Sequence, residues 1–446
     1  MYETHHLAVL SQVLTAMGCE ALHGTAESFH PFIASVRPHK GQAEAASNIL
    51  SFLTGSRLAQ GVLTEADSQM SGLCQDRYPL RTASQWIGPQ LEDLLLAHDQ
   101  LTVELNSTTD NPLIDVAHNL MHHGGNFQAA SVTSAMEKTR LTLQMLGKLL
   151  FAQGTEIINP ALNKGLPPNL SADDPSLSFT CKSIDINLAA YMAELAFLAN
   201  PVSTHVQSAE MHNQAVNSLA LISGRYTLQA VEILSLMSAA YLFLVCQALD
   251  LRVLQTMFFK AVKPRIEEAT ASLSSTAAPT HDPAKLCAAV WMRLAHAWDA
   301  ASTLDLPDRS AAAATAAATV LTEPGSGIES LAEVRAWAAT TTTLLASTYD
   351  GTRNTLFADY LEITPTYLGL ASRALYAFVR RELGVPLHRG LVDSPTHVLR
   401  EGGPQPSVPE KERRSIGSLV SGIYEAVRDG RVGAVVMGVV RDGLLK

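Results

Sequence analysis

The sequence contains few cysteines, and their arrangement matches no common disulfide or metal-binding pattern. The 446 residues include 5 cysteines, which are widely spaced: Cys19, Cys74, Cys181, Cys246 and Cys287. Their number is odd, and none forms the CxxC spacing of zinc sites or redox motifs. Unpaired thiols are typical of a reducing compartment. We therefore expect a cytoplasmic protein without disulfides.

Long runs of positive charge are also absent. The formal net charge is −10 at pH 7, and no basic run is longer than two residues, as at Arg413-Arg414. Because binding to nucleic acid requires clustered Lys and Arg, we do not expect a nucleic-acid partner. The N-terminal run Met1-Tyr2-Glu3-Thr4-His5-His6 has neither the basic nor the apolar region of a signal peptide. An anionic substrate would require a local arginine.

The most apolar stretch is short and interrupted for a membrane span. Residues 233–249 are bounded by acidic residues and barely reach the length that crosses a bilayer. Three polar residues interrupt this stretch: Ser235, Ser238 and Gln247. A buried core helix explains this length and composition better than a membrane span does, so we expect no membrane partner.

Apolar residues recur at helical spacing through the first two-thirds of the sequence. The pattern is clear near the N-terminus, at Leu7, Leu10, Val13, Leu14 and Met17. Helical spacing of this kind predicts an all-α fold. Residues 209–258 contain no proline and only one glycine, Gly224, which predicts a single very long helix. A helix of that length suggests a bundle that is shared between subunits.

The composition changes after Val262. Alanine, serine and threonine dominate residues 270–280, 311–318 and 336–343. Alanine favours helix and threonine does not, so we expect short helices with thin apolar faces, with disorder as the alternative. The apolar pattern returns from Arg373, and a loop at 394–412 precedes a final helix at about 415–428. The predicted regions are a helical-bundle core with the pocket residues (1–262), an Ala/Thr-rich helical insertion (263–372) and a C-terminal helical segment (373–446).

A polar stripe at the start of the predicted long helix is the first candidate site. Glu210, Asn213, Gln214 and Asn217 stand at positions i, i+3, i+4 and i+7, so they would share one helix face. A solvated face is the simpler explanation of such a stripe. Carboxamides stand, however, where a solvated helix usually has Lys and Glu, and buried amides require hydrogen-bond partners. Both interpretations stay open from the pattern alone.

Two loops supply further candidates. In Asp110-Asn111-Pro112, proline keeps the chain out of helix, so short hydrogen-bonding side chains converge on a fixed turn. In His122-His123-Gly124-Gly125, the adjacent histidines point apart and no third ligand stands at diagnostic spacing. We therefore expect no metal there, and the glycines are better explained by a close backbone approach.

Arginines near a tyrosine-proline turn are the candidates for binding an anion. Arg77 and Arg81 flank Tyr78-Pro79. An arginine is usually a surface residue, but its planar guanidinium is also the side chain best suited to a carboxylate. Lys182, which follows Cys181, is a weaker candidate. The residue pattern alone therefore indicates a polar site in a helical bundle and no specific reaction.

Several longer motifs are similar, in order along the chain, to segments of one enzyme family. They include Gln75-Asp76-Arg77-Tyr78-Pro79-Leu80-Arg81, Thr109-Asp110-Asn111-Pro112, Gly124-Gly125-Asn126-Phe127-Gln128, Asp174-Pro175-Ser176-Leu177-Ser178 and Ala215-Val216-Asn217-Ser218-Leu219. Together they resemble the C-terminal part of the aromatic amino-acid ammonia-lyases. Two further motifs resemble the fungal and plant phenylalanine branch: Met136-Glu137-Lys138-Thr139-Arg140 and Tyr376-Ala377-Phe378-Val379-Arg380. The resemblance covers nearly the whole chain except residues 269–372.

The resemblance implies an architecture and an assembly. The expected fold is an elongated helical bundle of the fumarase/aspartase-like type. The expected assembly is a homotetramer in which three subunits contribute to each active site. Residues 262–372 would correspond to the shielding insertion of the eukaryotic phenylalanine enzymes. The site residues would then face a subunit interface instead of converging within one chain.

The resemblance also implies roles for individual residues. By its position in the motif, Arg81 would bind the substrate carboxylate, and Gln75 and Tyr78 would shape the same corner. Asn111 would contact the prosthetic group, and Phe127 would pack beside it. Glu210 would lie near the substrate amine. The other residues that would line the pocket are Lys182 and Gln214.

One requirement of the family is not met within the sequence. The family's electrophile, 4-methylidene-imidazol-5-one, forms by cyclisation of an Ala-Ser-Gly tripeptide, and the 446 residues contain no Ala-Ser-Gly. We expect this segment upstream of Met1, together with the tyrosine that acts as base and the residues that select the aromatic ring. Because the proton β to the carboxylate is barely acidic, elimination needs both an activated amine and a positioned base. Lys182 or Glu210 cannot replace both.

The implied reaction is the deamination of phenylalanine to trans-cinnamate and ammonia. An aromatic aminomutase on the same scaffold is one alternative. A catalytically inactive subunit that completes the sites of a full-length relative in a mixed oligomer is another. A fragment of a longer ammonia-lyase is a third. In every case the expected ligand is a small aromatic amino acid.

Overall fold

Helices make up 72% of the structure, so the predicted all-α class is confirmed. The structure is a computed structural model that describes residues 1–61, 75–274, 282–324, 326–396, 409 and 413–444. The helices of the first half are α1 (Tyr2–Ala21), α2 (Pro31–Ser35), α3 (Lys40–Phe52), α4 (Tyr78–Arg81), α5 (Ala83–Leu105), α6 (Ala130–Ile158) and α7 (Lys182–Leu198). Those of the second half are α8 (Ala220–Ser274), α9 (Pro283–Ala300), α10 (Leu306–Leu321), α11 (Leu331–Ile363), α12 (Leu370–Ala377), α13 (Ile416–Arg428) and α14 (Arg431–Leu444).

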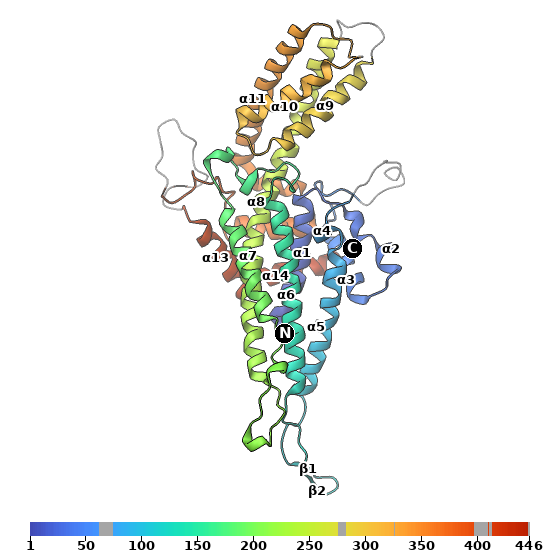
Figure 1. Ribbon diagram of the computed structural model, residues 1–446, viewed down its shortest axis with the longest axis vertical. Helices are drawn as coiled ribbons and strands as arrows, with labels where there is room; N and C mark the ends of the chain where they lie inside the picture. Colours follow the sequence, from blue (N-terminus) through green and yellow to red (C-terminus); the bar gives the residue numbers. More distant parts are fainter. Residues whose placement is uncertain (62–74, 275–281, 325, 397–408, 410–412, 445–446) are drawn as a thin grey trace.

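The body of the molecule is an elongated bundle (Figure 1). α6 packs against α5, α7 and α8, and α1 packs against α6 and α8. Two glycines allow α6 to approach its neighbours closely. A Cβ atom at Gly147 would lie 2.5 Å from Leu195 Cδ1, and one at Gly154 would lie 2.7 Å from Leu188 Cδ1. Buried leucines of α7 therefore pack directly on the α6 backbone, at the density of a protein interior.

α8 is the longest helix and runs out of the body into a second group of helices (Figure 1). Its 55 residues correspond to about 80 Å at 1.5 Å per residue. It has the length and apolar composition of a membrane span, but 78% of its most apolar window is buried inside the protein. The prediction that residues 233–249 form a buried core helix is therefore confirmed.

The predicted long helix exists, but its predicted start is wrong. α8 begins at Ala220 instead of near residue 209. Glu210, Met211, His212 and Leu219 have φ values between 49° and 72°, in the left-handed region. Because right-handed helix requires negative φ, these residues end any continuous helix before α8. Residues 210–212 form only a short 3-10 turn.

A second hydrophobic core lies between the far half of α8 and α9, α10 and α11 (Figure 1). α10 packs against both α9 and α11. Half of its buried residues are alanines, whose small side chains allow this close packing: Ala313, Ala314, Ala317 and Ala318. The Ala/Thr-rich residues 311–318 and 336–343 therefore form helices, as expected, whereas most of the stretch 270–280 lies outside the described residues. The helices are not all short, because α11 has 33 residues and begins where the Ser330 side chain accepts a hydrogen bond from Glu333 N–H.

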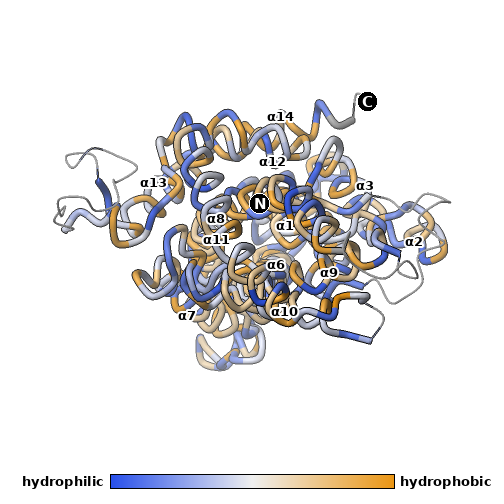
Figure 2. Tube along the Cα trace, turned by 90° about the horizontal axis from the view of Figure 1, so that it is seen from above, coloured by the Kyte–Doolittle hydropathy of each residue, from blue (hydrophilic) through white to orange (hydrophobic). Residues whose placement is uncertain are grey.

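The C-terminal segment returns to the body. α12 and α14 pack against α1, on the same side of it (Figure 2), and α13 packs against α8. α13 confirms the helix predicted at about 415–428, although α14 follows it, so it is not the final helix. A buried ion pair joins this segment to α8: Arg380 Nη2 lies 2.6 Å from Asp250 Oδ2, and both side chains are fully buried. Thr364 Oγ1 and the Tyr376 hydroxyl donate to Asp250 Oδ1.

Candidate functional site

α4 carries the predicted carboxylate-binding corner. Pro79 stands in the first turn of α4, where its fixed φ and missing N–H suit a helix start. Gln153, a buried residue of α6, donates to the Pro79 carbonyl at 2.9 Å and so fixes α4 on the bundle. The Arg81 guanidinium carbon lies 5.1 Å from the centroid of the Tyr78 ring, within the range of a cation–π contact. The ring of Tyr78 and the side chain of Gln75 are exposed to solvent.

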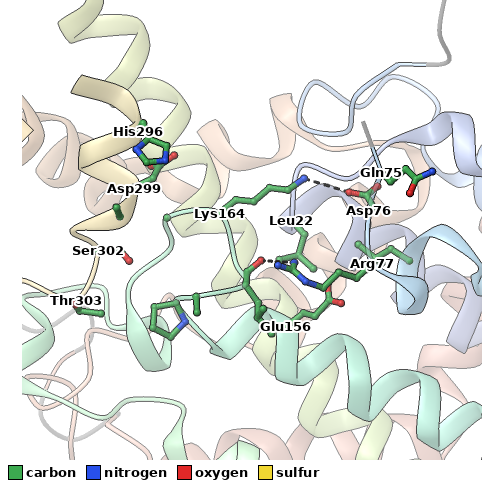
Figure 3. Close-up of a pocket in the computed structure, with 16 residues that line it drawn as sticks. Leu22, Gln75, Asp76, Arg77, Glu156, Lys164, His296, Asp299, Ser302 and Thr303 are labelled. Atoms are coloured by element: carbon green, nitrogen blue, oxygen red, sulfur yellow. Dashed lines mark hydrogen bonds and ion pairs between the residues drawn. The ribbon is translucent and has the colours of Figure 1, made fainter. Parts of the chain in front are cut away.

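A cavity of about 770 Å³, lined by several charged side chains, adjoins this corner (Figure 3). In the cavity wall, Lys164 Nζ lies 3.3 Å from Asp76 Oδ1, and Arg77 donates to the Leu162 carbonyl at 3.1 Å. Burial raises the pKa of the Glu156 carboxyl, and the neighbouring Arg77 opposes that rise. Of the predicted site residues, Gln75 alone lines this cavity, so it is not the pocket that the sequence predicts.

Asn111 and Phe127 meet at the opposite end of the bundle. They flank a hairpin of β1 (Leu113–Asp115) and β2 (Leu120–His122), which pair antiparallel and which the sequence analysis missed. A Cβ atom at Gly125 would lie 2.6 Å from the Phe127 ring and 2.8 Å from Asn111 Cβ. The expectation that these glycines permit a close approach is therefore confirmed at Gly125, which brings the two predicted residues together.

The adjacent histidines of the hairpin lie on the surface. His122 and His123 are both exposed. Among the residues that the structure describes, no group of three or more His, Cys, Asp or Glu side chains could hold a metal ion. The hairpin region therefore contributes the polar turn at Asn111 and the exposed ring of Phe127 to the candidate site, and its histidines lie outside that site.

Glu210 and Gln214 lie in the loop between α7 and α8, not on a helix face. The predicted helical stripe is wrong, because residues 210–212 have positive φ. Three of the four polar residues nevertheless lie together in the loop. Glu210 Oε2 accepts hydrogen bonds from Asn213 Nδ2 at 3.1 Å and from Gln214 Nε2 at 2.9 Å. Asn217 is separate and donates to the Gln207 carbonyl. These amides are not deeply buried, so burial does not explain why they are carboxamides.

Lys182 is the first residue of α7 and is exposed. Its Nζ atom lies 5.0 Å from the centroid of the Phe179 ring. The preceding Cys181 is fully buried, and burial raises the pKa of its thiol to about 12. A thiol with such a pKa stays protonated and unreactive near neutral pH, so Lys182 is the only candidate of this pair.

The predicted site residues do not converge within one chain. α4 and the start of α7 lie toward the upper end of the body, whereas the hairpin and the loop between α7 and α8 lie at its lower end (Figure 1). α5, which connects the Arg81 corner to the Asn111 turn, has 23 residues and spans about 35 Å. No single substrate bridges that distance. The candidate residues thus form separate, open groups. That these groups face a subunit interface stays a prediction.

No role was predicted from the sequence for the residues that hold these groups in place. Gln153 fixes α4, and Glu137 and Arg140 contact the loop that carries Glu210. All three are polar residues inside the long helix α6. Polar residues within a mainly apolar helix were the available signal, because a polar group that becomes buried there requires a hydrogen-bond partner.

Comparison with known proteins identifies the group to which this arrangement belongs. The family described as aromatic amino acid lyase matches residues 1–274. Phenylalanine ammonia-lyase lenB from Aspergillus lentulus is 53% identical over 443 residues, which cover 96% of this chain and 60% of that protein. A phenylalanine aminomutase (L-beta-phenylalanine forming) from Talaromyces islandicus is 46% identical over 439 residues, with the same coverage of 96% and 60%.

A solved structure shares the fold over almost the entire chain. The crystal structure of phenylalanine ammonia-lyase from Rhodosporidium toruloides superimposes with a TM-score of 0.88 at 44% identity, over 98% of this chain and 65% of that one. The chain thus spans less than two-thirds of the length of these relatives. The match includes residues 269–372, where the motifs gave no resemblance.

Proposed function

Because the chain belongs to the aromatic amino acid lyase family, we propose that it supplies the substrate-binding part of an enzyme that converts phenylalanine to trans-cinnamate and ammonia. Relatives that carry the name phenylalanine ammonia-lyase are 43–53% identical to it. The observation that carries the proposal is the separation of the candidate residues into open groups at opposite ends of one bundle. Such an arrangement is useful only if several chains meet around each site.

In this proposal, the two ends of the bundle bind different parts of the substrate. Arg81 presents a guanidinium, held near the Tyr78 ring, to the substrate carboxylate. Glu210 presents a carboxylate to the substrate ammonium, and Gln214 and Asn213 orient it through their hydrogen bonds to Oε2. Opposite charges at the two ends of the site would orient an amino acid before any chemistry takes place.

The family's prosthetic group, 4-methylidene-imidazol-5-one, supplies an electrophilic carbon that turns the substrate amine into a leaving group. Asn111 and Phe127 fit a wall beside a small planar group, because Gly125 draws them together while both side chains stay exposed. The 446 residues contain no Ala-Ser-Gly from which the group could form. We propose that the polypeptide that carries it lies outside these residues and completes the site in the assembly.

We further propose that the assembly is a homotetramer, or a mixed oligomer with a full-length relative. The bundle exposes large apolar side chains on α5, α7 and the first turns of α8: Leu95, Leu96, Val103, Leu105, Ile186, Phe197, Leu221 and Leu228. Large apolar surfaces of this kind mark interfaces between chains. The unpaired cysteines fit a cytoplasmic location.

An activity assay with a complementing subunit tests the proposal. The purified chain alone should produce no cinnamate from phenylalanine. A full-length relative with an Arg-to-Ala change at the position matching Arg81 should regain activity when it is assembled with this chain, because this chain supplies the missing guanidinium. The Arg81→Ala variant of this chain is the matched control and should not restore activity. Co-assembly without any rescue would refute the shared site.

The same assay distinguishes lyase from aminomutase. The 46% identity to a phenylalanine aminomutase makes β-phenylalanine the second candidate product. Both activities remove the amine, but only the mutase adds it back to the β-carbon. Chromatography of the products after rescue therefore decides: cinnamate with free ammonia supports the lyase, and β-phenylalanine supports the mutase.

A further inference from the structure

One face of α6 contacts both ends of the loop that carries Glu210. The loop comprises residues 199–219, between α7 and α8. At its end, Thr133 Oγ1 donates to the Ser218 carbonyl at 2.6 Å. At its start, Glu137 and Arg140 bind the backbone. These residues lie three or four positions apart, so they share one face of α6.

Glu137 holds the start of the loop through its carboxylate. Oε1 accepts hydrogen bonds from the backbone N–H of Val202 at 2.7 Å and of Ser203 at 2.9 Å, and Oε2 accepts one from Ser203 Oγ at 3.0 Å. Ser203 begins the 3-10 turn Ser203–His205. The first N–H groups of a helical turn have no partner inside the turn, so the carboxylate satisfies donors that would otherwise be unpaired.

Arg140 ties the loop to the start of α8. It is fully buried, and its Nη1 donates to the Ser223 carbonyl and to Ser223 Oγ, both at 2.8 Å. Its Nη2 donates to the Asn200 carbonyl at 3.4 Å and lies 3.9 Å from Glu137 Oε1. A buried guanidinium is costly to leave unpaired, so these contacts strongly favour one placement of the two chain ends.

Between these two ends, the described hydrogen bonds of the loop are internal. In the described part of the chain, the hydrogen bonds of residues 207–217 stay within that segment, including the backbone pair between Ala209 and Gln214 and the carboxamide contacts to Glu210. The segment is therefore an internally bonded unit whose position depends on its two anchored ends.

We propose that Glu137 and Arg140 are positioning residues that set where Glu210 and Gln214 stand in the substrate pocket. Neither residue touches the substrate. Glu137 and Arg140 place the loop in the isolated chain, whereas the effect of this placement on the substrate amine rests on the proposed function. Losing the Glu137 anchor frees the loop start and displaces the Glu210 carboxylate.

Hydrogen exchange of the chain tests the anchor without any catalysis. Glu137→Leu removes all three acceptor contacts, and exchange of peptides covering residues 199–206 should become at least about 10-fold faster, since a hydrogen bond to a charged group is lost. Glu137→Gln should stay close to wild type, because its amide oxygen can accept from the same two N–H groups. Ser203→Ala, which removes one contact only, should have a smaller effect and keeps the test informative if Glu137→Leu folds poorly.

The controls separate a local from a global effect. Glu194→Leu removes an exposed carboxylate of α7 and should leave exchange at 199–206 unchanged. Peptides of α10 should exchange equally in all variants. No difference between Glu137→Leu and wild type would overturn the proposal, and so would faster exchange throughout the chain in both Glu137→Leu and Ser203→Ala.

A kinetic measurement in the rescued assembly tests the consequence. With the change made both in this chain and at the matching position of the full-length relative, Glu137→Leu should lower kcat/KM for phenylalanine by about 10-fold or more, and Glu137→Gln should restore it to within about threefold of wild type. A chain that fails to rescue in every variant, wild type included, refutes the proposed function and leaves the exchange result standing. Equal kcat/KM for Glu137→Leu and wild type refutes the positioning role.

Discussion

The buried ion pair between Arg380 and Asp250 offers a direct test of how the C-terminal segment is attached to the bundle. Burial alone would lower the pKa of Arg380, but the adjacent Asp250 carboxylate raises it, so the arginine stays charged in the core. Asp250→Leu would leave this charge without its counter-ion. Breaking a buried pair from one side costs about 3–5 kcal/mol, because the remaining charge stays desolvated. We therefore expect Asp250→Leu to lower the free energy of unfolding by about that amount.

Urea denaturation followed by circular dichroism measures the change, and a neighbouring ion pair gives the control. Arg381 pairs with Glu362 at 2.9 Å, but these side chains are 49% and 75% exposed. Exposed pairs contribute about 0–1 kcal/mol, so Glu362→Leu should have little effect. The double variant Asp250→Leu, Arg380→Met should recover at least half of the loss, since no unpaired charge remains. Equal costs for Asp250→Leu and Glu362→Leu would refute the reasoning.

Three further predictions concern stability and association. Burial raises the pKa of the Glu20 carboxyl from its ordinary 4.5 to about 7, so the folded state binds a proton more tightly than the unfolded state. The free energy of unfolding should therefore fall by roughly 3 kcal/mol as pH rises from 4.5 to 7. Urea titrations at both pH values should show no such fall for Glu20→Gln. Gly88→Ala should destabilise the chain by roughly 2 kcal/mol or more, because the new Cβ atom would lie 2.5 Å from the backbone nitrogen of Gln42. Gly224→Ala should stabilise α8 by about 0.5–1 kcal/mol, because its new Cβ atom would have no neighbour within 4 Å. Thermal denaturation of the two variants compares these effects. The purified chain should associate in size-exclusion chromatography with light scattering, and a stable monomer would contradict the apolar interface on α5 and α7.

The sequence could predict the helices but not the breaks between them. Periodicity and the absence of proline correctly indicated a very long helix, since both describe what a segment favours on average. The break at residues 210–212 depends on the φ angles of Glu210, Met211 and His212, and none of these residue types requires a left-handed conformation. Anchors outside the segment, among them Glu137, hold the loop instead. Such long-range contacts leave no periodic pattern in the sequence.

The candidate site was predictable in its residue types and not in its geometry. Arg81, Tyr78 and Asn111 carry chemistry that follows from short motifs, because a guanidinium, an aromatic ring and an amide have the same properties in any fold. Their separation by the length of α5 does not follow from these motifs, since each motif describes only its own neighbourhood. The resemblance implied a site divided between chains, and the structure adds that α4 and the hairpin lie at opposite ends of one bundle.

α6 relates the two ends of the proposed site to each other. Gln153 fixes the α4 corner and Glu137 fixes the loop of Glu210, so the same helix sets both positions. Their separation of 16 positions corresponds to about 24 Å along a rigid helix. One inserted residue would rotate one anchor by about 100° relative to the other and move it by about 1.5 Å. In the assembly that we propose, a second chain meets both ends at once, so the uninterrupted length of α6 would constrain the shared site as much as the residues that touch the substrate.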